Sequence, residues 1–219
     1  MKKLSGCFLC VMLLAFCMAP SAWSVPFTLQ GVDYPSQISA SVDFTYDSSN
    51  SKINIDITNT STITSSLTAF AFNVPNNVTG ASLTGTIPTG WSADFNPNAI
   101  DTPGQYGFFD LAGITGPNFN GGDVADGIPA PPNTTFSFTF SLTGTGISTL
   151  NTDSFLNLFS APPAHGQPDP QFFIARFQGI GTEGGSDVAI PGSPVPEPAT
   201  LLLLGAGLVG LAGFGKKKF

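Results

Sequence analysis

Few residues in this sequence have the chemistry for acid-base or nucleophilic catalysis. The single histidine, His165, lies in the segment 162–166, which is rich in Pro and Gly and typical of a solvated loop. No Gly-x-Ser-x-Gly elbow surrounds any serine, although a serine triad built on His165 stays open. Asp pairs could also supply the two carboxylates of a glycoside hydrolase. Because no motif with a mechanism supports either reaction, the sequence predicts no enzymatic activity and leaves a secreted hydrolase as a weaker alternative.

Calcium is the metal that the sequence favours. Asp123 and Asp126 lie in the glycine-rich segment 121–127, and Asp101 and Asp110 are expected in neighbouring loops. Carboxylate oxygens on flexible loops suit Ca²⁺. The spacing departs from the EF-hand pattern, so turn capping by these aspartates is the alternative. Zinc is disfavoured, because one histidine without a cysteine outside the N-terminal segment cannot supply its usual ligand set.

Two further patterns could bind a ligand through a surface. Trp91 and Tyr106, with Phe108 nearby, could stack on a sugar ring, although such aromatics more often close a hydrophobic core. Alternate threonines in the segment 58–64 would share one face of an extended chain, which suggests ice binding. Ice recognition requires several flat rows, whereas this is one row, made of Thr58, Thr60, Thr62 and Thr64.

Charge excludes one large class of partner. The whole chain has a net charge of −7, but between residues 25 and 194 only Lys52 and Arg176 are basic, against thirteen acidic residues. Nucleic-acid binding needs clustered Lys and Arg to neutralise phosphates. The sequence therefore predicts no nucleic-acid partner.

Alternation of apolar and polar residues dominates the middle of the chain. The segments 38–46, 53–58 and 136–143 each place apolar side chains on one face and polar side chains on the other. The segments 67–74 and 171–177 are apolar on both faces and are expected to be covered on both sides. With about ten strands separated by Gly, Pro, Asn and Asp, the pattern predicts an all-β, two-sheet β-sandwich of the jelly-roll kind. This ectodomain is expected to span residues 25–178, followed by a Gly/Pro-rich spacer at 179–194.

The N-terminal residues 1–24 have the three parts of a secretory signal. Two lysines precede a short apolar run, and small residues stand at the −3 and −1 positions before a cleavage point between Ser24 and Val25. Signal peptidase is therefore an expected partner. All three cysteines, Cys7, Cys10 and Cys17, fall inside this signal, so the mature chain is expected to fold without a disulfide.

The C-terminal end has the pattern of a membrane span. Residues 199–215 are apolar, and three lysines follow them. A helix of this length would reach about 25 Å, enough to cross a bilayer with snorkelling lysines. The basic end predicts that the C-terminus lies on the cytoplasmic side of the membrane and the domain on the outer side. The sequence thus predicts one C-terminal transmembrane helix.

The tail 195–219 closely resembles the PEP-CTERM sorting tail, in which a Val-Pro-Glu-Pro signature precedes one span and a basic cluster. That tail has also been labelled an ice-binding protein C-terminal domain, a label that describes the tail and not an activity. The resemblance implies an exported bacterial protein processed by an exosortase that recognises Pro196, Glu197 and Pro198. It also implies a precursor anchored in the inner membrane and then moved to the cell surface or extracellular matrix.

Three functions therefore remain for the domain. The favoured one is a structural or adhesive role at the surface, where exopolysaccharide is a candidate partner. The second is a calcium-supported, lectin-like module with Trp91 and Tyr106 as its sugar platform and Asp123 and Asp126 as calcium ligands. The third is a secreted hydrolase.

Overall fold

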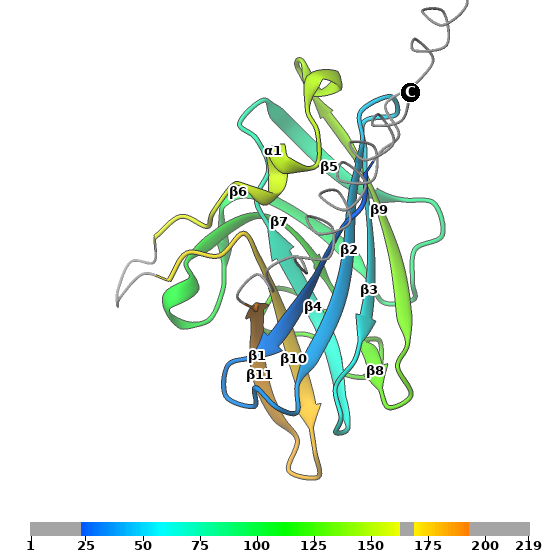
Figure 1. The fold of residues 1–219 in the computed structure, drawn as a ribbon, viewed down its shortest axis with the longest axis vertical. Helices are drawn as coiled ribbons and strands as arrows, with labels where there is room; N and C mark the ends of the chain where they lie inside the picture. Colours follow the sequence, from blue (N-terminus) through cyan, green and yellow to red (C-terminus); the bar gives the residue numbers. More distant parts are fainter. Residues whose placement is uncertain (1–22, 163–168, 193–219) are drawn as a thin grey trace, which may run out of the picture.

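The computed structural model describes residues 23–162 and 169–192, and most of the elements in them are β-strands (Figure 1). The prediction of an all-β domain is confirmed. Within these two ranges no helix is long and apolar enough to cross a membrane. The predicted span at 199–215, the sorting tail, His165 and all but the last two residues of the predicted leader lie outside the described residues.

Eleven strands make up the domain. They are β1 (Val25–Gly31), β2 (Ser39–Asp47), β3 (Lys52–Asn59), β4 (Ser65–Phe72), β5 (Val78–Thr84), β6 (Ser92–Asp101), β7 (Phe108–Ile114), β8 (Ile128–Ala130), β9 (Thr135–Gly144), β10 (Phe173–Ile180) and β11 (Gly185–Pro191). Three short helical turns lie between strands: η1 (Gly104–Tyr106), η2 (Ile147–Thr149) and α1 (Asp153–Leu156).

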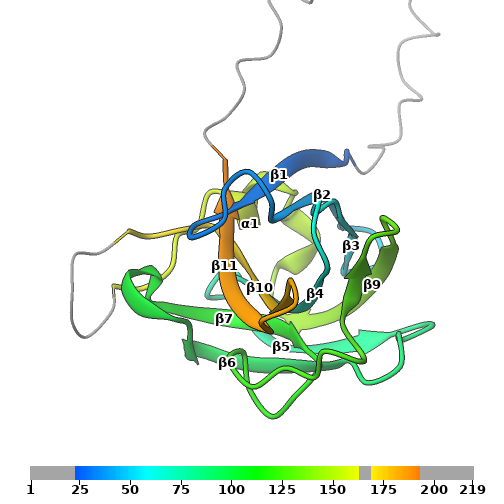
Figure 2. The same ribbon diagram turned by 90° about the horizontal axis from the view of Figure 1, so that it is seen from below.

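The strands form one continuous antiparallel sheet rather than the two separate sheets that the sequence predicted. Its order is β5-β9-β3-β2-β1-β11-β10-β4-β7-β6, with β8 paired to β4. The two ends of this path, β5 and β6, lie side by side, so the sheet is nearly closed around its own core (Figure 2). The joining strand is β1, which pairs with β2 on one side and β11 on the other. Most of the segment 179–194, predicted as a spacer, is occupied by the end of β10 and by β11.

The interior of this barrel-like sheet is filled by aromatic side chains. Phe70 is fully buried, and its ring lies 4.9 Å from that of Phe138 and 5.8 Å from those of Phe173 and Trp91. A Cβ atom at Gly113 would lie 2.6 Å from the Phe70 ring, so β7 needs glycine there for the ring to fit. Edge-to-face and offset aromatic pairs of this kind stabilise a core beyond the area they bury.

Part of the outside of the sheet is also buried, which explains why β4 and β10 are apolar on both faces. A second hydrophobic cluster lies on the outer sides of β4, β7, β10 and β11, and the turn η1 and the loop 115–127 pack over it. Phe119 of that loop is only 1% exposed. We call this surface the covered outer face. Its other members include Ala69, Ala71, Ala112, Ile114, Ile174 and Val188.

The outer sides of β1, β2, β3 and β9 differ, because mostly small polar residues occupy them and no loop of the described residues buries them in a hydrophobic cluster. We call this surface the open outer face. The strand register places hydroxyl residues side by side in a row across all four strands, namely Thr28, Ser41, Thr58 and Thr135. In the next row Asp43 and Asp56 are directly opposite each other.

Candidate functional site

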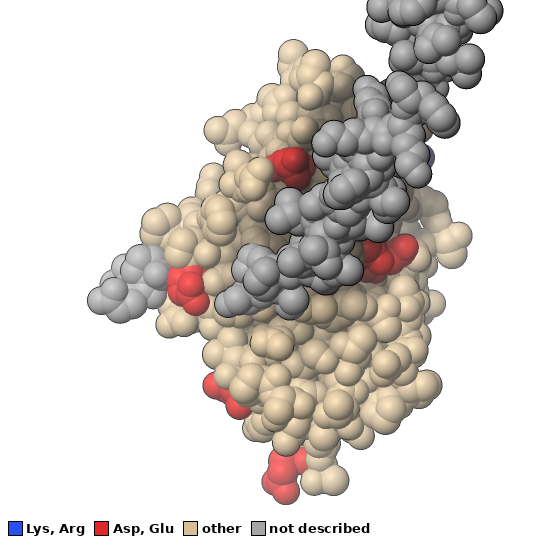
Figure 3. Space-filling view, in the orientation of Figure 1, with Lys and Arg blue, Asp and Glu red and all other residues tan. Residues whose placement is uncertain are grey.

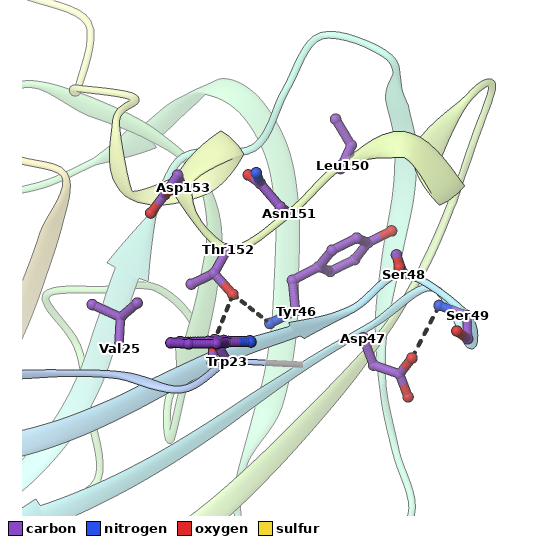
Figure 4. A pocket seen from close by; sticks show the side chains of 10 residues that line it. All are labelled: Trp23, Val25, Tyr46, Asp47, Ser48, Ser49, Leu150, Asn151, Thr152 and Asp153. Atoms are coloured by element: carbon purple, nitrogen blue, oxygen red, sulfur yellow. Dashed lines mark hydrogen bonds between the residues drawn. The ribbon is translucent and has the colours of Figure 1, made fainter. Parts of the chain in front are cut away.

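A pocket of about 400 Å³ lies where the predicted leader meets the domain, between the β2–β3 turn and the segment 150–153 (Figure 4). Thr152 links its two sides: its Oγ1 accepts a hydrogen bond from the Tyr46 backbone N–H and donates one to the Trp23 carbonyl, both at 3.1 Å. The Trp23 side chain is 79% exposed at the rim. The pocket offers hydrogen-bonding groups but no nucleophile paired with a base.

The carboxylate in this pocket, Asp47, is engaged within its own turn. Asn50 Nδ2 donates to it at 2.7 Å, and the backbone N–H groups of Ser49 and Asn50 donate at 3.0 and 3.1 Å. The Asn50 side chain is the main cause that holds the pKa of Asp47 below its ordinary value. Burial raises the pKa of Tyr46, whose hydroxyl donates to the Ile147 carbonyl at 2.8 Å. Both groups thus stabilise the local fold.

The predicted leader cleavage point falls at the edge of the folded domain. Strand β1 begins at Val25, the residue that the prediction makes the mature N-terminus. Ser24 lies just outside the sheet, where its hydroxyl donates to Asp43 at 3.1 Å. A cut between Ser24 and Val25 would therefore remove no residue of the strand.

Two aspartates of the predicted calcium region, Asp123 and Asp110, bond to different backbone segments, and Asp101 and Asp110 lie on strands β6 and β7 rather than in loops. Asp123 accepts a hydrogen bond from the Ala125 N–H at 2.8 Å, which is a turn-capping contact. Asp110 is buried on β7 and accepts from the backbone N–H groups of Val74 and Asn98 at 3.0 and 2.7 Å, which stabilises an irregularity in β6. In residues 23–162 and 169–192, no three His, Cys, Asp or Glu side chains gather where they could hold a metal ion.

Trp91 and Tyr106, the predicted sugar platform, belong to different hydrophobic clusters. Trp91 packs inside the sheet against Phe138, and its indole N–H donates to the Asp126 carbonyl at 2.8 Å. Tyr106 lies in η1 on the covered outer face. Each side chain is 6% exposed, so neither ring face is open to solvent. A shared stacking platform would require both to move.

The four threonines of the predicted ice-binding row do not lie on one strand. β3 ends at Asn59, so Thr58 is on the strand and the other three follow it in the connection to β4. Their hydroxyls bond to neighbouring segments: Thr58 to Thr135 at 2.6 Å and Thr60 to Ser39 at 2.8 Å. One regular row of hydroxyls, which includes Thr58, runs across the strands of the open outer face instead, a pattern that only the register reveals.

Sequence reasoning missed Arg176 and Asp187, two charged residues near each other at the end of the sheet. Arg176 was noted only as one of two basic residues, and Asp187 as one of thirteen acidic ones. Both face a pocket of about 360 Å³. The one signal in the sequence was a charged residue within the otherwise apolar segment 171–177.

On one face of the described residues, the acidic side chains are dispersed. On the face shown in Figure 3 they lie in separate patches divided by neutral surface. A scattered distribution of this kind raises the overall negative potential without concentrating it at one point.

Comparison with known proteins identifies one part of the chain. A family model, described as the PEP-CTERM protein-sorting motif, matches residues 194–218. The tail of this chain is a PEP-CTERM sorting motif. No curated protein and no solved structure matches the chain. The PEP-CTERM match confirms the predicted resemblance, and the motif implies an exported protein targeted by an exosortase-type enzyme, made as a membrane-anchored precursor and sorted to the cell surface.

The PEP-CTERM motif follows the folded domain closely. The last strand, β11, ends at Pro191, and the match begins at residue 194. In the sequence, Glu197 stands between Pro196 and Pro198, each of which lacks a backbone N–H, and all three lie outside the described part of the chain.

Proposed function

We propose that this chain displays a barrel-like β-domain at the cell surface or in the extracellular matrix, in a structural or adhesive role without enzymatic activity. The observation that supports this best is the PEP-CTERM motif at residues 194–218, placed directly after the strand that completes the sheet. A cut near Pro196–Pro198 would release the domain from its anchor and leave all eleven strands in place.

The proposed removal of the leader is also compatible with the fold. Removal of a leader by signal peptidase between Ser24 and Val25 would leave β1 whole, and β1 is the strand that joins the two parts of the sheet. The domain has no cysteine, so its stability comes from the two hydrophobic clusters and does not depend on an oxidising compartment.

The sorting role is tested by substituting Glu197 in the native host. The Glu197→Ala variant should accumulate as an uncut precursor in the membrane, because the carboxylate between the two prolines of the motif is lost. Glu183→Ala is the matched control, since Glu183 is the other glutamate of the chain and lies in the exposed turn between β10 and β11. Intact-mass spectrometry of membrane and secreted fractions distinguishes the two. Normal maturation of Glu197→Ala would overturn the proposed recognition of this residue.

The proposed leader cleavage point is tested on the processed protein from the same native host. N-terminal sequencing of the processed protein should begin at Val25. A chain that begins within β1 would contradict the proposed cleavage point, because the sheet would then lose part of its joining strand.

A further inference from the structure

A pocket on the covered outer face combines the one arginine of the chain with two aspartates, Asp33 and Asp187, and with neutral polar and apolar residues. Its volume is about 360 Å³. Its floor comes from β10 and β11, one wall from the β1–β2 loop and the other from the turn η1 and the residue before it. The charged residues of its lining are Arg176, Asp33 and Asp187.

Arg176 points outward from β10 because its neighbours Ala175 and Phe177 pack into the interior cluster. Among the described residues its guanidinium makes one hydrogen bond to a side chain, from Nη2 to Ser186 Oγ at 2.9 Å, and its buried Nε has no acceptor there. Burial lowers the pKa of this guanidinium, and the nearby Asp187 carboxylate opposes that shift. A partly desolvated arginine with unused donors is a strong binding group for a planar anion.

The closest carboxylate is already used by the backbone. Asp187 is 2% exposed and accepts hydrogen bonds from the N–H groups of Asp33 and Tyr34 at 3.1 Å each, and from its neighbour Val188 at 2.7 Å. These contacts hold its oxygens toward the β1–β2 loop. Among the described residues Asp187 makes no hydrogen bond to Arg176, so its charge acts on the guanidinium only from nearby. The Nη groups, and not the buried Nε, are therefore the donors that a ligand can reach.

We propose that this pocket binds the carboxylate of a single sugar acid, such as one uronate unit of an acidic polysaccharide. A monoanion fits better than a phosphate or sulfate dianion, because one guanidinium must offset Asp33, Asp187 and the excess of acidic residues across the domain. The volume suits one hexose ring. The exposed groups of Gln105 and Asp33 are placed to bond ring hydroxyls, and Val32, Val188 and Pro103 supply apolar contacts.

This assignment names a ligand class for the adhesive role proposed above and rests on that role for the choice of a polysaccharide acid. It does not depend on how the tail is processed. If the protein is sorted normally but does not bind the sugar acid, only the ligand assignment of this pocket is wrong. If sorting fails, the binding measurement on the full chain can still be made.

The test is a titration of the full chain in detergent micelles with glucuronate, followed by isothermal titration calorimetry. We expect saturable binding that is weakened at least tenfold in Arg176→Gln. Lys52→Gln is the matched control, because it removes the same charge from the open outer face and should bind like the parent. Should Arg176→Gln fail to fold, Gln105→Glu alters an exposed side chain, and its added negative charge should weaken binding by a similar factor.

Two other ligands define the specificity. Glucose, which lacks the carboxylate, should not bind measurably, and propionate, which has a carboxylate but neither hydroxyls nor a positive charge, should bind at least tenfold more weakly than glucuronate. Equal binding of propionate would overturn the sugar-acid assignment. Equal weakening in Arg176→Gln and Lys52→Gln would mean that the pocket is not the site.

Discussion

The two outer faces of the sheet are made from the same kind of strand but are stabilised in opposite ways. On the covered outer face, small apolar residues such as Ala69 and Ala71 allow a loop to pack closely, and Phe119 fills the space above them. On the open outer face, short hydroxyl residues meet water directly. The difference teaches that residues pointing out of a barrel-like sheet carry little stability until a loop buries them.

The covered outer face also has, at its edge, charged side chains that are hydrogen-bonded to other parts of the fold. Asp187 and Arg176 both lie at its edge, with partners fixed by the fold. Charged residues on the open face, such as Asp43 and Asp56, stay exposed and face each other without a cation between them. An aspartate thus stabilises the fold at the edge of the covered outer face, whereas the two opposed aspartates of the open outer face repel each other slightly.

The largest expected difference between the faces comes from Phe119→Ala. Removing this fully covered ring should lower the free energy of unfolding by about 3–5 kcal/mol, because it empties a packed space. Thr139→Ala on the open face, which loses only the hydrogen bond to Asn54, should cost less than about 1 kcal/mol. Denaturant unfolding of the full chain measures both. Equal costs would mean that the loop 115–127 does not stabilise the sheet.

A buried carboxylate on the covered side should matter more than an exposed one. Asp187→Asn should lower the free energy of unfolding by about 1.5–3 kcal/mol, because the backbone donors of Asp33 and Tyr34 lose a charged acceptor. Thermal denaturation at constant ionic strength is the measurement. A change below the error of the fit would show that these contacts are dispensable.

Cations should stabilise the domain through its overall charge. Sodium and calcium chloride at matched ionic strength should raise the melting temperature equally, by about 2–4 °C, which corresponds to about 1 kcal/mol for a domain of this size. A saturable gain with micromolar to millimolar calcium alone, lost in the Asp123→Asn, Asp126→Asn double variant, would instead establish the calcium site that the sequence suggested.

On the open face, Asp43→Asn should be slightly stabilising, by about 0.2–1 kcal/mol, because it removes the repulsion from the directly opposed Asp56. The gain should shrink in high salt, since both groups are exposed. The sign of this effect, opposite to that of Asp187→Asn, is the sharpest test of the contrast between the faces. Destabilisation by Asp43→Asn would contradict it.

The smallest effect concerns Asp47 in the β2–β3 turn. Asn50→Ala should raise the pKa of Asp47 toward its ordinary value, because the Asn50 side chain is the main cause of the lowering. Since the pKa is lowered in the folded state, the turn gains stability above the unfolded pKa and loses it as the pH falls through the folded value. Carboxyl chemical shifts followed by NMR titration report the change. An unaltered titration would assign the shift to the backbone donors instead.

The sequence by itself determined the all-β class, because alternation in β2, β3 and β9 leaves no other regular structure. It also determined the PEP-CTERM tail, whose signature is local and needs no fold. Apolar residues on both sides of β4 and β10 correctly predicted strands buried on both faces.

Only the tertiary structure decided how the strands join and where the polar groups meet. Alternation states which side of a strand is buried but not which strand lies beside it, so one closed sheet and two packed sheets have the same sequence pattern. The pairing of β1 with both β2 and β11 made that choice, and it turned a predicted spacer into the strand that completes the sheet. The same closure brings Arg176, Asp33 and Gln105 to one pocket from three distant segments, a proximity that no local pattern encodes.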